Sequence, residues 1–140
     1  MKKIFLGILL ASALMACHQG NKSAPATDSA AVAANAPIIK FEKESFDFGK
    51  IKQGDKVSYD FKFINMGKSP LIIKDAVASC GCTIPEWHPK TPVLPGNGGV
   101  ISVTFNSAGK SGLQDKQITI TANTNPAQSM VHLIGEVLTK

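Results

Sequence analysis

Val57-Ser58-Tyr59-Asp60-Phe61-Lys62-Phe63 is the stretch that decides the fold of this chain of 140 residues. Apolar side chains occupy every second position, and the side chains between them are polar. Successive side chains of a β-strand point to opposite faces of a sheet. The alternation therefore predicts a strand with one buried face and one solvated face.

Further strands are expected before and after this stretch. Residues 38–41 form the first candidate, and Phe46 and Phe48 alternate around a polar residue until Gly49 ends the run. After a turn at residues 65–70, the later candidates are residues 71–78, 101–105, 118–120 and 130–138. About seven strands separated by turn residues, with no convincing helix, are typical of an immunoglobulin-like β-sandwich. The expected fold class is therefore all-β.

Length and charge exclude some functions. A chain of this length has room for one domain. It contains 15 lysines, no arginine and 10 acidic residues, which gives a formal net charge of +5. Two of the lysines, Lys2 and Lys3, lie in a segment that we expect to be removed. The remaining weak positive charge includes no dense basic run, so a nucleic-acid partner is not expected.

Residues 1–16 have the order of features of a bacterial secretory leader. Two lysines are followed by an apolar stretch at residues 4–13 and then by Leu14-Met15-Ala16-Cys17. The apolar stretch is too short to span a bilayer, which takes about 20 apolar residues. Leu-x-Ala-Cys resembles the lipoprotein box, in which the cysteine is lipidated on sulfur. We therefore expect residues 1–16 to be a lipoprotein signal peptide and Cys17 to be the lipidation site.

Residues 17–37 are expected to be the lipidated cysteine and a disordered tether, since seven alanines, two prolines and no aromatic residue form no apolar pattern. Residues 38–140 would then form the single immunoglobulin-like domain. His18 and Gln19 follow Cys17 without an acidic residue, which resembles lipoproteins released to the periplasmic face of the outer membrane. The expected partners are the membrane, through the lipid anchor, and an unidentified envelope protein.

Several spaced motifs occur in order along residues 41–137. They are Phe46-Asp47-Phe48-Gly49-Lys50-Ile51 with Gly54, Phe61-x-Phe63-x-Asn65-x-Gly67-x-x-Pro70-Leu71, Ser79-Cys80-Gly81-Cys82-Thr83, Pro95-Gly96 before Ile101-x-Val103-x-Phe105, and Gly112 with Ile118-x-Ile120 and Asn123. Together they resemble a bacterial family of unknown function, the one numbered fifteen seventy-three, and the Ser-Cys-Gly-Cys-Thr motif is the most specific part. The resemblance implies an immunoglobulin-like sandwich on exported, often lipidated proteins that are common in Bacteroidota. More distantly it is similar to assembly modules of cilia and to major sperm protein, and it implies no reaction.

Cys80-Gly81-Cys82 is the one constellation that could carry chemistry. In a strand, residues two apart point to the same side, and Gly81 would let the backbone bend between the two sulfurs. One interpretation is structural, as a local disulfide in an oxidising compartment or as buried thiols. A second is a soft-metal site for copper or zinc, with His88 as a nitrogen ligand. A third is thiol–disulfide exchange by the same pair.

Trp87 and His88 follow this motif in a segment that several prolines interrupt, and we expect a loop there. The side chain of Trp87 is interpreted as a lid over the core, with an exposed contact to a partner as the alternative. Residues 95–99 are rich in glycine but precede a strand, so we expect a hairpin turn there, not a phosphate loop. The chain has no nucleophile elbow.

The function expected from the sequence is a lipid-anchored binding or assembly module without catalytic residues or a required cofactor. Such a module would act through its loops or through the edges of its sheets, where a partner strand can be added. The first alternative is a copper- or zinc-binding lipoprotein that uses Cys80, Cys82 and His88. The second alternative is a redox protein that uses the same two cysteines.

Overall fold

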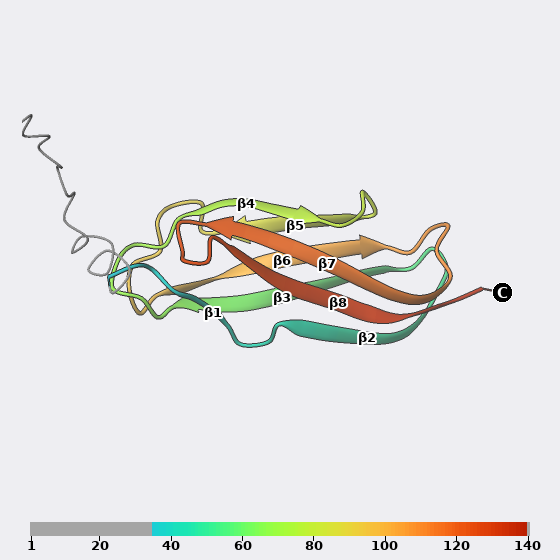
Figure 1. Ribbon diagram of the computed structural model, residues 1–140. Coiled ribbons are helices and arrows are strands. Elements are labelled where there is room, and N and C mark those ends of the chain that lie inside the picture. The colour runs from blue at the N-terminus through green and yellow to red at the C-terminus, as the bar shows by residue number, and fades with distance from the viewer. Residues whose placement is uncertain (1–34, 140) are drawn as a thin grey trace, which may run out of the picture.

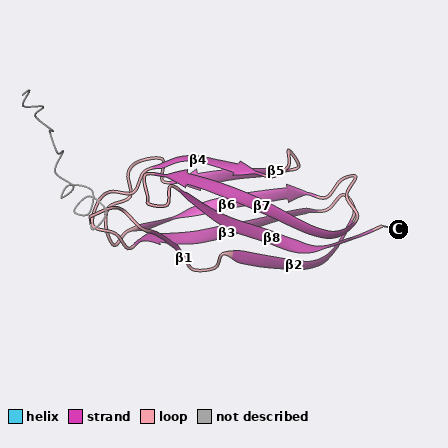
Figure 2. Cartoon of the chain, in the orientation of Figure 1, coloured by secondary structure: helices cyan, strands magenta, loops and turns pink. Residues whose placement is uncertain are grey.

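The computed structural model describes residues 35–139, which form a β-sandwich (Figure 1). The strands are β1 (Ile39–Phe41), β2 (Ser45–Lys52), β3 (Lys56–Asn65), β4 (Ile73–Ala78), β5 (Thr83–His88), β6 (Gly98–Asn106), β7 (Gly112–Ala122) and β8 (Gln128–Leu138). The described residues contain strands and loops and no helix (Figure 2). The predicted all-β class is therefore confirmed.

Two four-stranded sheets pack face to face. One sheet has the order β1-β3-β6-β5 and the other the order β2-β8-β7-β4. All strand pairs are antiparallel except β2 with β8, which is parallel. The chain changes sheets between β1 and β2, so the two halves of the N-terminal segment belong to opposite layers. Because of this change, β1 pairs with only the last residues of β3, and the rest of β3 has no partner strand on that side.

The strand β5 is the main correction to the sequence analysis, which placed Trp87 and His88 in a loop. Thr83–His88 pairs with β6 along its whole length. Pro85 is tolerated because β5 is an edge strand. The amide of Asn106 donates to the carbonyl of Cys82, so the backbone N–H and C=O groups of the even-numbered residues of β5 point toward β6. The nitrogen of Pro85 therefore faces away from the sheet, where no hydrogen bond is lost.

Two strand boundaries also differ from the expectation. Gly49 does not end the first alternating run, because β2 continues through it with a register shift between Asp47 and Lys50. Gly49 has a φ of 70° there, a conformation that favours glycine, and its amide donates to the side chain of Asp47. Leu71 was expected to start a strand, but it forms only an isolated bridge with Val93, and β4 begins later.

The core lies between the sheets and comes from the alternating positions that the sequence indicates. The largest fully buried side chains are Phe61, Phe105, Leu71, Ile101, Ile118, Ile120, Leu133, Val103, Val131 and Val137. Burying one such side chain stabilises a fold by roughly 1.5–3 kcal/mol. The strand β2 joins this core from the side, since the ring of Phe46 stacks on that of Tyr59 with centroids 3.8 Å apart.

The two ends of the sandwich differ in composition. We call the end where the described chain begins the N-proximal end; it comprises residues 35–38, 65–72, 89–97 and 123–127. The loops of the distal end, residues 53–55, 79–82 and 107–111, lie at the side of the C-terminus (Figure 1). Residues 35–37, assigned to the tether from sequence, pack against the N-proximal end, where Pro37 is buried. A β-carbon at Gly67 would collide with the backbone of this segment.

Candidate functional site

Cys80, Gly81 and Cys82 form the turn that connects β4 to β5 at the distal end. A disulfide joins the two sulfurs, and the two Cα atoms are 5.3 Å apart. Because β4 and β5 are edge strands of opposite sheets, this turn carries the chain from one layer of the sandwich to the other. The structure therefore brings Cys80 and Cys82 together, but within a turn and not on one face of a strand, which was the expected geometry.

The surroundings of the disulfide are those of a packed turn. The hydroxyl of the buried Thr83 lies 3.6 Å from the sulfur of Cys80 and 3.9 Å from that of Cys82. The side chain of Cys82 packs against the core, and its carbonyl accepts the amide of Asn106. In the bonded state neither sulfur is a thiolate, which is the form that binds soft metals.

His88 and Trp87 lie at the other end of β5 from the cysteines. Five residue steps along a strand correspond to roughly 16 Å, so His88 is not placed beside Cys82 to complete a metal site. Among residues 35–139, no group of three or more His, Cys, Asp or Glu side chains is arranged to hold a metal ion. Trp87 is half-buried against the core, and the ammonium of Lys90 lies 3.3 Å from the centroid of its ring.

Cys17, the expected lipidation site, lies outside the described residues. The same holds for the expected signal peptide and for most of the expected tether. None of the described residues belongs to a helix that could span a membrane.

The pKa of Lys116 is displaced from its ordinary value. Burial lowers the pKa of its ammonium, the neighbouring Lys110 lowers it further, and Asp115 opposes the shift. The ammonium also lies 5.4 Å from the centroid of the ring of Phe105. These neighbours are those of a lysine tucked into the distal end of the core, so we assign it no part in catalysis.

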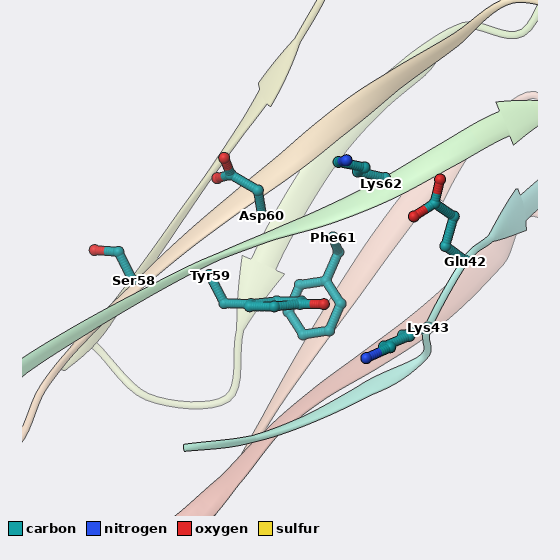
Figure 3. Close-up of a pocket in the computed structure, with 7 residues that line it drawn as sticks. All are labelled: Glu42, Lys43, Ser58, Tyr59, Asp60, Phe61 and Lys62. Carbon is teal, nitrogen blue, oxygen red and sulfur yellow. The ribbon is translucent and has the colours of Figure 1, made fainter.

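The unpaired part of β3 is the feature that the sequence analysis missed. A cavity of about 540 Å³ lies along it, lined by Glu42, Lys43, Ser58, Tyr59, Asp60, Phe61 and Lys62 (Figure 3). The last hydrogen bond between the β1 segment and β3 runs from the amide of Glu42 to the carbonyl of Lys62, at 3.0 Å. Beyond Glu42 the chain crosses to the other sheet, and the side of β3 that faced β1 is left open.

The direction of the backbone groups of β3 follows from these bonds. Because N–H and C=O of one strand residue point to the same side and alternate along the strand, the even-numbered residues share the direction of Lys62. The amides and carbonyls of Lys56, Ser58 and Asp60 therefore point outward. Among residues 35–139, no strand pairs with β3 on this side between Lys56 and Phe61.

The outer edges of β2, β4 and β5 are interrupted, and the edge strand β1 has only three residues. The edge of β5 contains Pro85, which cannot donate a hydrogen bond. The edges of β2 and β4 each contain a register shift, between Asp47 and Lys50 and between Ile73 and Asp75. Proline and bulges are the features with which proteins protect sheet edges against pairing. The open stretch of β3 is regular, with neither proline nor bulge.

The profile of the family described as protein of unknown function (DUF1573) matches residues 39–137. The chain belongs to this family. The resemblance drawn from the Ser-Cys-Gly-Cys-Thr motif and its companions is thus confirmed. The match to DUF1573 runs from the first residue of β1 to the penultimate residue of β8, so it includes both the disulfide turn and the open edge of β3.

Solved structures confirm the immunoglobulin-like sandwich of this DUF1573 domain. A protein of unknown function from Porphyromonas gingivalis W83 is 15 % identical with a TM-score of 0.64, and the alignment covers 74 % of this chain and 48 % of that one. The ASH / PapD-like domain 7 of human CEP192 is 10 % identical with a TM-score of 0.58, over 76 % and 89 % of the two chains. The secreted serine protease VesC from Vibrio cholerae is 11 % identical with a TM-score of 0.55, over 80 % and 25 %.

At these identities the likeness shows the fold alone. The chain spans about half the length of the Porphyromonas protein and about a quarter of VesC. No curated protein matches the chain. The family and the fold therefore fix the architecture, and the function has to be argued from the geometry of the described residues.

Proposed function

We propose that this DUF1573 chain is a non-enzymatic binding module of the bacterial cell envelope, held at the outer membrane by a lipid on Cys17. It binds an extended segment of an envelope protein as an added strand on the open edge of β3. The observation that carries the proposal is the regular, unpaired stretch from Lys56 to Phe61 beside a cavity of about 540 Å³.

Strand addition suits this edge because the backbone supplies the affinity and the side chains supply the selectivity. The outward amides and carbonyls of Lys56, Ser58 and Asp60 form a row that an incoming strand can pair with. Each hydrogen bond gained in this way contributes about 0.5–1.5 kcal/mol net. Lys43 and Glu42 border the cavity, so charges of both signs are available to select the partner.

The soft-metal alternative gains no support from the described residues, because the two sulfurs are bonded to each other and His88 lies at the far end of β5. Thiol–disulfide exchange by Cys80 and Cys82 stays a prediction that needs its own test.

The test of strand addition is the variant Asp60→Pro, with Asp60→Asn as its matched control. A proline at this position removes an outward amide and leaves the pairing with β6 intact, so thermal stability should change little. A photo-crosslinking residue at Ser58 should capture one envelope protein in living cells. The yield should fall at least tenfold with Asp60→Pro and stay unchanged with Asp60→Asn.

A crosslinking residue at Glu86, on the interrupted edge of β5, serves as the positional control and should capture nothing specific. Equal capture from Ser58 and Glu86, or capture that survives Asp60→Pro in a folded protein, would show that β3 is not the binding edge. Mass spectrometry of the protein purified from the envelope tests the lipid on Cys17 separately.

A further inference from the structure

The N-proximal end of the sandwich carries an excess of positive charge. Its loops and the strand residues next to them, which are residues 35–41, 64–74, 88–98 and 122–129, contain four lysines and no acidic residue. The lysines are Lys40, Lys68, Lys74 and Lys90, and all four are exposed. The nearest acidic residues along the chain are Glu42 and Asp75, which directly follow two of these ranges, so the excess of lysine belongs to the loops and their adjoining strand residues.

The same end exposes apolar side chains on its loops. Ile38 is 54 % exposed, Met66 57 %, Ile72 44 % and Leu94 55 %. Ile38 and Leu94 lie in two separate loops, and Met66 and Ile72 lie near the two ends of the β3–β4 loop. Backbone hydrogen bonds hold these segments together. The amide of Met66 donates to the carbonyl of Ile38, at 2.8 Å, and the amides of Leu71 and Val93, the neighbours of Ile72 and Leu94, donate to each other's carbonyls, both at 2.8 Å.

A buried side chain fixes this arrangement in advance of any binding. The amide nitrogen of Asn65 donates to the carbonyls of Ser69 and Val93, and its oxygen accepts from the amides of Ile38 and Gly67. Three loops are thereby tied to one fully buried residue. Because these loops are already ordered, binding does not have to pay the entropy of ordering them. Their lysines and apolar side chains can therefore contact the same partner surface at once.

We propose that the N-proximal end docks onto the surface of a bilayer that contains anionic lipids. Exposed apolar side chains and lysines at the same end of the domain match the boundary between acyl chains and anionic headgroups. This proposal rests on the proposed lipid at Cys17, which precedes the described chain by 17 residues. Even fully extended, that segment spans only about 60 Å, so an anchored domain would stay near the membrane, and the chain would enter the domain at this end.

The orientation has a consequence for the proposed binding edge. The strand β3 runs from the distal end to the N-proximal end, and its open stretch lies in the distal half of the strand. With the N-proximal end on the membrane, Lys56 to Phe61 would point into the periplasm. The membrane surface and the edge for strand addition would then be occupied at the same time without competing for residues.

Trp87 provides a direct readout, because it is the only tryptophan of the chain and lies at the N-proximal end of β5. The full chain purified from the envelope is reconstituted on vesicles of equal parts phosphatidylglycerol and phosphatidylcholine with brominated acyl chains. Its fluorescence should be quenched there at least twofold more than on vesicles of brominated phosphatidylcholine alone. Segments 65–72 and 89–97 should be protected from hydrogen exchange only on the anionic vesicles.

The double variant Lys40→Glu, Lys68→Glu and the single variant Leu94→Gln should each remove most of the additional quenching. The matched controls are Lys110→Glu and Leu113→Gln at the distal end, which should leave the quenching unchanged; Leu113 is 86 % exposed. Circular dichroism checks that all variants fold. Equal quenching on both kinds of vesicle, or equal sensitivity to substitutions at the two ends, would overturn the proposal.

The experiments distinguish an error in the proposed lipid anchor from an error in the proposed docking surface. If mass spectrometry finds no lipid on Cys17, the anchor is wrong, and quenching on added anionic vesicles still tests the surface. If the lipid is present and Trp87 is quenched equally on both vesicles, the anchor stands and the docking surface is wrong. Protection of residues 65–72 by a co-purified protein without vesicles would also overturn the docking surface.

Discussion

Asn65 and Ser107 fix opposite ends of the sandwich, and both are fully buried polar residues. Asn65 uses both its amide nitrogen and its oxygen to tie together three segments of the N-proximal end. The hydroxyl of Ser107 contacts the carbonyls of Lys52 and Asp55, at 3.1 and 2.7 Å, and accepts from the amide of Gly54, at 2.9 Å. It therefore ties only one hairpin to the start of the β6–β7 loop.

The difference between the two hydrogen-bond networks indicates a different structural task at each end of the sandwich. An end on which several distant loops must present one continuous surface needs a branching side chain that can bond to all of them. An end that only has to close a hairpin can be held by a single hydroxyl, and at the distal end the disulfide turn connects the remaining pair of strands. We infer that the larger network of Asn65 serves the surface described above.

The largest expected effect is that of Asn65→Ala. The substitution removes four hydrogen bonds of a fully buried side chain, one of them buried and three partly buried, which should cost about 3–4 kcal/mol of the free energy of unfolding. For a domain of this size that corresponds to a fall in Tm of about 15 °C. Thermal unfolding followed by circular dichroism measures it.

The matched control for this variant is Asn97→Ala at the same end. Asn97 is exposed and bonds to Asn65 through its backbone alone, so its side chain should contribute less than about 0.5 kcal/mol. If the two variants unfold at the same temperature, the buried amide does not organise the N-proximal end. A folded Asn65→Ala protein should also lose the quenching of Trp87 on anionic vesicles, since its loops are no longer aligned.

Ser107→Ala should have a smaller effect, confined to the distal end. The hydroxyl has one proton to donate and accepts one amide, so its loss should cost about 1–2 kcal/mol. Chemical denaturation curves compare this variant with Ser111→Ala, whose exposed hydroxyl should be neutral. Vesicle binding should not change in either variant, and a change in Ser107→Ala would mean that the two ends are coupled.

Much of this fold could be predicted from the sequence because its strands alternate cleanly. The structure buries the apolar positions of residues 61–63, 101–105 and 118–120 and partly buries Val57 and Tyr59, and the spaced motifs were sufficient to identify the family. The strand β5 was missed because Pro85 argues against a central strand, and only the pairing partners reveal that β5 lies at an edge.

The candidate site was harder to predict than the fold, for a physical reason. The sequence shows two short runs at residues 38–41 and 46–48, but not that they belong to different sheets. That change of sheet is what opens the edge of β3. The disulfide between Cys80 and Cys82 was among the predicted alternatives, because it depends only on local geometry. The separation of His88 from Cys82 could not be predicted, because it depends on β5 being an extended strand.

The last of these effects, similar in size to that of Ser107→Ala, is expected for the double variant Cys80→Ser, Cys82→Ser. The disulfide joins cysteines at a sequence separation of 2, so it constrains the unfolded chain only slightly. Its loss should therefore cost only about 1–2 kcal/mol of the free energy of unfolding. The Tm of the variant should match that of the unaltered protein in reductant. A small loss of stability with unchanged capture from Ser58 supports a structural role for the turn. Unchanged stability with lost capture from Ser58 would instead contradict a structural role, because a purely structural bond cannot be removed without a cost to the fold.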